Sequence, residues 1–226
     1  MVQAVIFDFD GVIIDSELFH LRALNHVLAR YGFEISTDDY YKNCVGHIDI
    51  DLLHLFKNKG LLRLDGQEIE NLIEQKRDMV RELAEKEAKL CRGVLNFLQM
   101  LSQNTVPMAI CSGSSIMEIQ VILEKTNLHH FFNAIVSSEH VKNGKPDPEG
   151  MLLALRKLRQ KARSPIFAGQ CIVIEDSPGG VAAAKAAGMH AVAVTSSYDA
   201  HHLDLADKVV DHLGQLTISN LHQLCA

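Results

Sequence analysis

Short apolar runs alternate with amphipathic stretches through much of the chain. After residue 93, runs of a few apolar residues are separated by stretches whose apolar positions recur at helical intervals, which is typical of βαβ units. With a further run near the N-terminus, the pattern predicts five strands, at residues 3–7, 106–111, 133–137, 171–174 and 190–194. The predicted fold class is therefore α/β, with a parallel sheet at its core.

One predicted helix is well delimited at both ends. The alanine-rich stretch from Val181 to Ala187 follows Ser177, a natural N-cap, and Pro178, which suits the first helical position. Gly188 suits the position directly after the helix. The sequence therefore predicts a helix that begins just beyond the fourth strand.

Residues 16–87 interrupt the alternation, because their apolar positions have helical spacing only. One series stops at Gly32, and a second follows it; their members are Leu18, Leu21, Leu24, Leu28 and Tyr31, then Ile69, Leu72, Ile73, Val80 and Leu83. We therefore expect a helical domain at 16–87, inserted into an α/β core domain made of 1–15 and 88–226. The linkers are expected near 12–16 and 87–93.

Charge and composition exclude several classes of partner. The net charge of -6 and pI near 6.0 argue against a nucleic-acid or anionic-membrane surface, which requires a basic face. An N-terminal leader pattern and a membrane-spanning apolar stretch are both missing, which predicts a cytoplasmic protein. The five cysteines are far apart and form no metal or disulfide pattern, so reduced thiols are expected. We expect a monomer that acts on a small molecule.

Polar residues follow four of the five predicted strands. Asp8 and Asp10 come after the first strand and Ser112 after the second, while Lys145 lies in the loop after the third. Glu175 and Asp176 follow the fourth; this set is Asp8, Asp10, Ser112, Lys145, Glu175 and Asp176. Each also has an ordinary structural explanation, as a turn, a helix cap or a solvated charge. Parallel strands, however, bring their carboxyl ends to one edge of the sheet, where α/β proteins bind ligands.

The charges at this edge predict a metal ion. Four carboxylates face one ammonium, and carboxylates held close together resist joint ionisation. Mg²⁺ takes oxygen ligands and commonly bridges one or two carboxylates to a substrate phosphate. We therefore expect Mg²⁺ to be bound by Asp8, the backbone carbonyl of Asp10, and Asp176, with Glu175 supporting or contributing.

The ordered motifs resemble those of the haloacid dehalogenase (HAD) superfamily of phosphohydrolases. They are Asp8-Phe9-Asp10-Gly11-Val12 with Asp15-Ser16, then Ser112, then Lys145-Pro146-Asp147-Pro148, then Glu175-Asp176-Ser177-Pro178-Gly179-Gly180. The resemblance implies a Rossmann-like core and makes residues 16–87 a helical cap in the C1 position. Among its branches, the β-phosphoglucomutase-like sugar-phosphate phosphatases are the most similar.

The resemblance also implies roles for single residues. Asp8 becomes the nucleophile that forms an aspartyl-phosphate, and Asp10 the general acid and base. Ser112 and Lys145 would bind phosphoryl oxygens, helped by backbone amides around Phe9, Asp10 and Gly113. The dehalogenases of the superfamily have no acid two positions after the nucleophile, so Asp10 argues against dehalogenation.

The cap is expected to select the substrate, through His20, His47 and Lys76. Lys76 lies on the apolar stripe of its helix, and its alternative explanation is a stem lying over the core with the head in water. Where the mutase carries a Ser-Arg pair for a second phosphate, this chain has Ile48-Asp49. An acid cannot replace that clamp, so a hydrolase of a sugar or sugar-alcohol phosphate is preferred. A mutase-type phosphotransferase and an inactive interaction protein are the alternatives.

Overall fold

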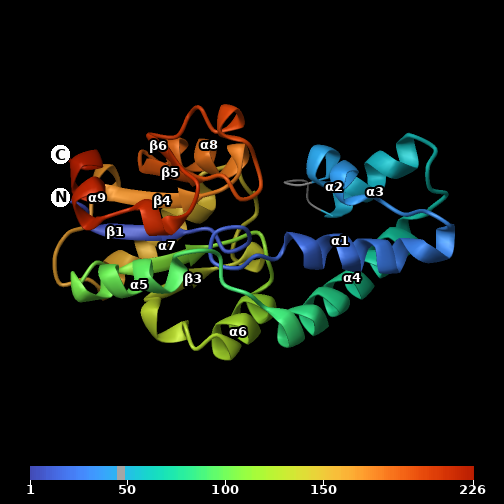
Figure 1. Ribbon diagram of the computed structural model, residues 1–226, viewed down its shortest axis with the longest axis horizontal. Coiled ribbons are helices and arrows are strands. Elements are labelled where there is room, and N and C mark those ends of the chain that lie inside the picture. Colours follow the sequence, from blue (N-terminus) through green and yellow to red (C-terminus); the bar gives the residue numbers. More distant parts are fainter. Residues whose placement is uncertain (45–48) are drawn as a thin grey trace. The chain divides into compact units, whose positions relative to one another are not determined.

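The computed structural model describes residues 1–44 and 49–226. The chain divides into two compact units (Figure 1). The core unit consists of residues 1–15 and 88–226, and the inserted unit of residues 16–87. His47, one of the predicted specificity residues, lies outside the described residues.

The core unit contains a six-stranded parallel sheet in the order β3-β2-β1-β4-β5-β6. The strands are β1 (Ala4–Phe7), β2 (Met108–Cys111), β3 (Ala134–Val136), β4 (Cys171–Glu175), β5 (His190–Val194) and β6 (Lys208–Val210). This is the strand order of the Rossmann fold, so the predicted α/β fold class is confirmed. The sequence analysis missed β6, which has three residues and lies at the edge of the sheet.

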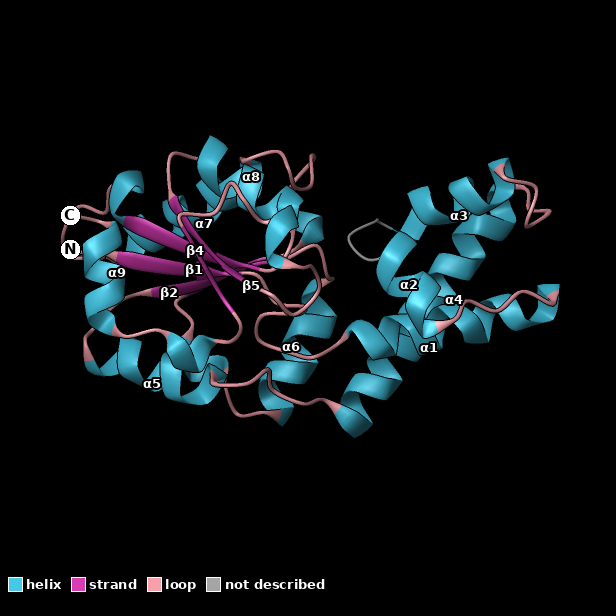
Figure 2. Ribbon diagram, turned by 45° about the horizontal axis from the view of Figure 1, so that its top comes forward, coloured by secondary structure: helices cyan, strands magenta, loops and turns pink. Residues whose placement is uncertain are grey.

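Helices cover both faces of this sheet (Figure 2). They are α5 (Val94–Gln103), α6 (Ile116–Lys125), α7 (Glu149–Lys161), α8 (Pro178–Ala186) and α9 (Ile218–Leu224). All residues of β1, β2 and β4 are buried, as expected for strands enclosed on both faces. The α8 helix begins and ends as predicted: Ser177 caps it by accepting a hydrogen bond from the Gly180 amide, and Gly188 follows with φ of 71°.

All regular secondary structure in the described residues of the inserted unit is helical. Its helices are α1 (Glu17–Leu28), α2 (Thr37–Asn43), α3 (Asp49–Asn58) and α4 (Gly66–Glu87). The two longest, α1 and α4, pack against each other and bury Leu24 and Leu72, while α3 also contacts α4. These helices occupy the residues whose apolar spacing predicts a helical insertion.

The two segments that connect the units lie side by side in the core unit. Asp15 donates its amide hydrogen to the Lys89 carbonyl over 3.0 Å, and Cys91 donates to the Ile13 carbonyl over 3.0 Å. Ile14 and Leu90 form an antiparallel bridge between them. The insertion therefore starts and finishes at neighbouring points of one backbone ladder.

The strand order changes direction at β1. The chain builds β2 and β3 on one side of β1 and then returns to build β4, β5 and β6 on the other. Phe7 pairs with Ile110 of β2 and with Ile174 of β4, so the residues that follow these three strands meet at one edge. Ligands bind at such a switch point in open α/β sheets.

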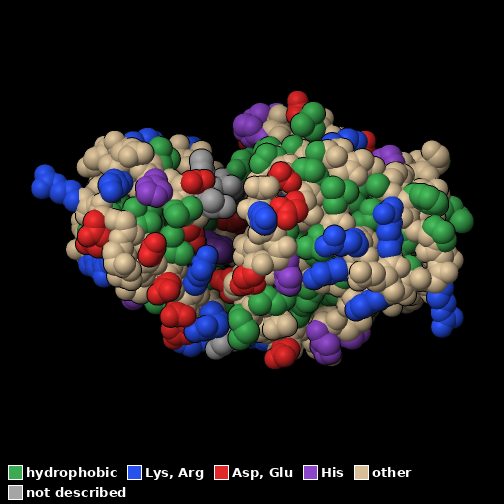
Figure 3. Space-filling view, turned by 180° about the vertical axis from the view of Figure 1, so that it is seen from behind, with side chains coloured by type: hydrophobic (Ala, Val, Ile, Leu, Met, Phe, Trp, Pro, Cys, Tyr) green, Lys and Arg blue, Asp and Glu red, His purple; other side chains and the backbone are tan. Residues whose placement is uncertain are grey.

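The surface carries charges of both signs. Figure 3 shows basic and acidic side chains interspersed with hydrophobic ones over the face that it presents. None of the helices in the described part of the chain has the length and apolar character needed to cross a membrane.

Candidate active site

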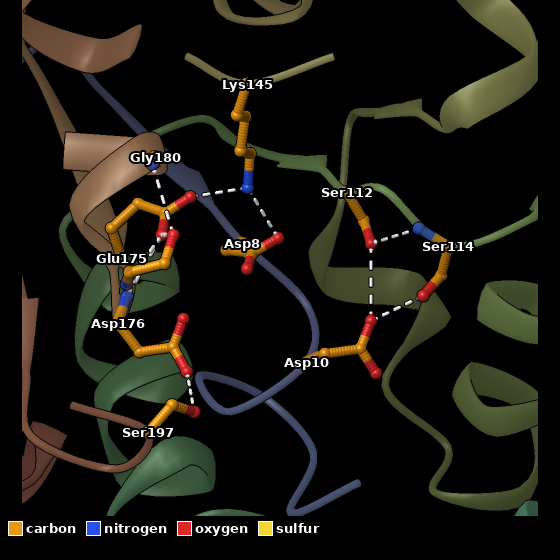
Figure 4. A network of polar contacts seen from close by, with 10 residues as sticks. Asp8, Asp10, Ser112, Ser114, Lys145, Glu175, Asp176, Gly180 and Ser197 are labelled. Carbon is orange, nitrogen blue, oxygen red and sulfur yellow. Dashed lines mark hydrogen bonds and ion pairs between the residues drawn. The ribbon is translucent and has the colours of Figure 1, made fainter. Parts of the chain in front are cut away.

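A buried ion-pair group lies at the carboxyl edge of β1 and β4. The Lys145 ammonium is 2.7 Å from Asp8 Oδ1 and also pairs with Glu175 Oε1 (Figure 4). Asp8 follows β1 and is held by its own amide, which donates to the Ile174 carbonyl over 2.9 Å. Lys145 comes from the loop between β3 and α7, where the Lys145–Pro146 peptide bond is cis. Three separate segments therefore bring these charges together, as predicted.

Glu175 is wholly buried and folds back over the turn that begins α8. Its Oε2 accepts hydrogen bonds from the Asp176 amide (3.1 Å), the Ser177 amide (3.1 Å) and the Ser177 hydroxyl (2.9 Å). Gly180 makes room for the carboxylate, because a Cβ at this position would lie 1.8 Å from the Glu175 carboxyl carbon. Both oxygens of Glu175 are therefore engaged, one by Lys145 and the other by the turn.

Asp176 is held by a residue that follows β5, the strand to whose end the sequence analysis assigned no polar residue. The hydroxyl of Ser197, which follows β5, donates to Asp176 Oδ2, and the hydroxyl of Ser196 donates to the Gly11 carbonyl. Gly11 has φ of 70°, and a Cβ on it would lie 1.8 Å from Asp176 Oδ2. A glycine is thus required beside Asp176 for both its backbone angle and its lack of a side chain.

Asp10 contacts two serine hydroxyl groups. The Ser114 hydroxyl donates to Asp10 Oδ2 over 2.5 Å, and the Ser112 hydroxyl lies 3.5 Å from the same oxygen (Figure 4). Ser112 in turn accepts a hydrogen bond from the Ser114 amide over 2.9 Å. Asp8 and Asp10, two positions apart in the sequence, therefore have chemically different partners.

Burial dominates the electrostatics of Asp8. It raises the pKa of the Asp8 carboxyl to about 7, against the lowering effect of Lys145 and with further increases from Glu175 and Asp10. Burial alone would lower the pKa of Lys145, but Asp8 and Glu175 outweigh it and raise that pKa well above its ordinary value. Lys145 therefore stays an ammonium, while the carboxylates around it exceed the charge that it can balance.

Three of these carboxylates form a group that could hold a metal ion. One oxygen each from Asp8, Glu175 and Asp176 lies within 4.8 Å of the others. An all-oxygen donor set suits a hard divalent cation, and the surplus of negative charge would be relieved by one. The chain thus has the acidic cluster that the sequence analysis predicted, and its donor set fits Mg²⁺.

The inserted unit has a polar cluster of its own. The Lys76 ammonium of α4 lies 2.5 Å from Asp49 Oδ1 of α3 and 3.1 Å from His20 Nδ1 of α1. Only 5% of Lys76 is exposed, so the interpretation that its head lies in water is wrong. Two of the predicted specificity residues, His20 and Lys76, are therefore brought together, with Asp49 as their acidic partner.

Comparison with known proteins decides the family. The sequence model of the family described as haloacid dehalogenase-like hydrolase matches residues 5–194. The chain belongs to this family. The predicted resemblance is thus confirmed.

Similar proteins of this family include two phosphatases and a mutase. The hydrolase is 27% identical to (DL)-glycerol-3-phosphatase 2 of Arabidopsis thaliana, over 94% of this chain and 88% of the relative. It is 30% identical to a phosphorylated carbohydrates phosphatase of Thermotoga maritima, over 84% of each. A crystal structure of β-phosphoglucomutase from Clostridium difficile superimposes with a TM-score of 0.83 at 25% identity, over 100% of this chain and 97% of that one. The predicted class, a phosphoric monoester hydrolase, is confirmed.

The remaining predicted residues of the hydrolase lie around the acidic group. Phe9 is wholly buried between Asp8 and Asp10, and Gly113 is exposed beside Ser112. Two amides at the start of α6 already have partners, because Ser115 accepts from the Glu118 amide and Glu139 accepts from that of Ile116. An anion at this turn would therefore rely on the Ser112 hydroxyl and the preceding backbone.

Sequence reasoning missed the serines that orient the two acids of the hydrolase. Ser114 lies two residues after the predicted Ser112, but three serines so close together carry no signal that distinguishes one from another. Ser197 could have been found, because it follows the fifth predicted strand. That strand was treated as the exception, and the structure shows that its end reaches Asp176 as well.

Proposed function

We propose that the protein is a Mg²⁺-dependent phosphatase that hydrolyses a small phosphorylated metabolite, a sugar or sugar-alcohol phosphate, through an aspartyl-phosphate intermediate. The observation that carries this proposal is the pairing of Asp8 with Lys145, beside the carboxylates of Glu175 and Asp176, at the switch point of the sheet. Family membership and the phosphatases among the relatives support the same reaction.

In the proposed reaction, a carboxylate oxygen of Asp8 attacks phosphorus and the bond to the leaving alcohol breaks. Asp10 gives its proton to the alcohol oxygen as that bond breaks. Water then attacks the aspartyl-phosphate, Asp10 takes the proton of this water, and inorganic phosphate leaves. Lys145 and Ser112, with the amides around Phe9 and Gly113, would bind the oxygens that are not transferred.

Asp8, Asp176 and the backbone carbonyl of Asp10 would hold Mg²⁺. When bound, the ion would offset the carboxylate surplus and the negative charge of the phosphate. Glu175 belongs to the same cluster, but its oxygens already accept hydrogen bonds from Lys145, Asp176 and Ser177. We therefore assign Glu175 the role of fixing Lys145 and the α8 turn, with the metal held by the other ligands.

The inserted unit would select the alcohol part of the substrate. His20 and Lys76 are the candidates there, and Asp49 balances the charge of Lys76. A lysine already paired with a carboxylate has little capacity to bind a second phosphate, whereas the cluster offers donors and acceptors to hydroxyl groups. This favours an uncharged polyol leaving group and disfavours the bisphosphate that a mutase must retain.

The decisive experiment is a phosphatase screen over sugar, sugar-alcohol, nucleotide and short-chain phosphates, in Mg²⁺ and in excess chelator. We expect Mg²⁺-dependent release of inorganic phosphate, with the highest kcat/KM on a monophosphate of a polyol. Conversion of β-glucose 1-phosphate to the 6-phosphate after priming with a bisphosphate would establish the mutase instead. If no compound of the panel were turned over, the alternative of a catalytically inactive interaction protein would be favoured. Size-exclusion chromatography with light scattering tests the expected monomer.

A further inference from the structure

The described partners of Asp8 and Asp10 both donate hydrogen bonds but differ in charge. Asp8 Oδ1 is paired with an ammonium, which only donates and which favours the ionised carboxylate. Asp10 Oδ2 accepts from the Ser114 hydroxyl over 2.5 Å, a neutral partner that adds no positive charge. The hydroxyl of Ser114 can therefore hold the Asp10 carboxyl group in a fixed orientation.

We propose that Ser114 is a positioning residue, which holds the Asp10 carboxyl group in the orientation from which it exchanges a proton with the leaving alcohol and the attacking water. This inference rests on the proposed function. The hydrogen bond from the Ser114 hydroxyl to Asp10 Oδ2 restricts the rotation of the carboxyl group, and the Ser112 hydroxyl lies farther from the same oxygen.

The backbone of Ser114 is fixed independently of Asp10. Its amide donates to the Ser112 hydroxyl over 2.9 Å, and its carbonyl accepts from the Ser138 amide (3.1 Å) and hydroxyl (3.3 Å). The next residue, Ser115, starts α6 with a capping box closed by Glu118. A hydroxyl mounted on such a backbone holds its partner in one place, which is what acid catalysis requires of a proton donor.

Ser112 cannot fill this role equally well. Its hydroxyl is 3.5 Å from Asp10 Oδ2, at the outer limit of a hydrogen bond, and it already accepts from the Ser114 amide. In the proposed reaction its hydrogen is donated to the phosphate. Ser114 would then remain the hydroxyl that orients Asp10 throughout the cycle.

The test compares Ser114→Ala and Ser114→Thr with the wild type, on two substrates that differ in their need for an acid. Glycerol 3-phosphate has a poor leaving group and p-nitrophenyl phosphate a good one. We expect Ser114→Ala to lower kcat on glycerol 3-phosphate by about 10- to 100-fold and on p-nitrophenyl phosphate by less than about threefold, with both KM values little changed. Ser114→Thr, which keeps the hydroxyl, should recover most of the loss.

Ser102→Ala is the matched control, because Ser102 is an exposed serine of α5. It should leave both activities unchanged. An equal loss on both substrates in Ser114→Ala, or no recovery in Ser114→Thr, overturns the inference and leaves the phosphatase proposal intact. If the wild type is inactive on the whole phosphate panel, both the proposed function and this inference are wrong. If Ser114→Ala fails to fold by circular dichroism, Ser114→Cys replaces it, because a thiol is only a weak donor.

Discussion

Each unit of the protein contains a lysine paired with a carboxylate, and the two pairs differ in how their charge is balanced. In the core unit, Lys145 faces Asp8 and Glu175, with further acids close by. In the inserted unit, the ion pair of Lys76 among the described residues is with Asp49, and His20 is its other neighbour. One lysine therefore belongs to a site with too much negative charge, and the other to a pair that is balanced.

This difference distinguishes a catalytic site from a substrate-recognition site. Burial, with a further contribution from Glu175 and Asp10, raises the pKa of Asp8 in the core unit, and such perturbed groups are typical of catalytic centres. The surplus of carboxylates there also favours binding of a cation. The Lys76 and Asp49 pair has no such surplus, so it can present polar groups without a metal ion. Substitutions in the core unit should therefore act on the rate of reaction, and those in the inserted unit on the choice of substrate.

The largest effect is expected for Asp8→Asn, which removes the nucleophile. Turnover should fall to background on every phosphate tested, while the thermal unfolding temperature stays at or above that of the wild type, because a neutral amide replaces a buried acid. Phosphate release and calorimetry measure the two quantities. Asp204→Asn, at an exposed aspartate, is the control and should change neither. Full activity in Asp8→Asn would contradict the assigned mechanism.

Asp10→Asn should be the next most severe, because it removes the proton donor and acceptor but leaves the nucleophile. The expected loss in kcat is about 10²–10⁴-fold on alkyl phosphates, the usual range for general acid-base catalysis. The loss should be smaller for aryl phosphates, whose leaving groups need less protonation. Steady-state kinetics on both substrate types measures it, and equal losses would argue against the acid role.

Replacing each lysine by methionine compares the two regions directly. Lys145→Met leaves Asp8 and the wholly buried Glu175 without their cation, which should lower stability by about 3–5 kcal/mol and kcat/KM by at least about 100-fold. Lys76→Met leaves Asp49, whose side chain is 27% exposed and remains partly solvated, so a loss of about 1 kcal/mol is expected. Urea unfolding and a substrate panel measure both variants. Equal losses of stability and activity in the two variants would contradict the distinction between the two lysine pairs.

The smallest effect expected is a pH dependence of the stabilisation by Mg²⁺. The pKa of Asp8 rises from 3.8 to about 7 on folding without metal, so the folded protein binds a proton more tightly and loses stability as the pH rises through that window. Mg²⁺ favours the ionised carboxylate, so it should raise the unfolding temperature more at pH 8 than at pH 5.5. Thermal shift assays measure this, with Asp8→Asn as the control in which the pH dependence weakens. If Mg²⁺ raised the unfolding temperature equally at both pH values, Asp8 would not be a ligand of the metal.

The strands and the polar residues at their ends were predictable because the apolar runs are long and the carboxyl ends of parallel strands must meet. Asp8, Lys145 and Glu175 were located in this way and do lie together. The strand β6 was not predicted, because it has only three residues, two of which are only partly buried, and it gives no apolar run of its own. Length and burial thus decided which elements the pattern could show.

Side-chain partners were much harder to predict than positions. The sequence marks Lys76 as unusual on an apolar stripe, but only the packing of α3 and α1 against α4 reveals Asp49 and His20 as its partners. Ser114 and Ser197 have no local pattern at all, since a serine is common in any turn. Their roles depend on which loops the sheet order brings together, and that order is not encoded locally.

The paired backbone at Ile14 and Leu90 makes the inserted unit exchangeable. Because the chain leaves and re-enters the core unit at adjacent rungs of one ladder, the distance to be spanned is the same whatever the length of the segment between them. A replacement helical module needs only to begin and end side by side to be accepted. The sheet and its acids can then be kept unchanged while the inserted unit is replaced. This makes the core unit suitable as a constant catalytic scaffold for grafted recognition domains.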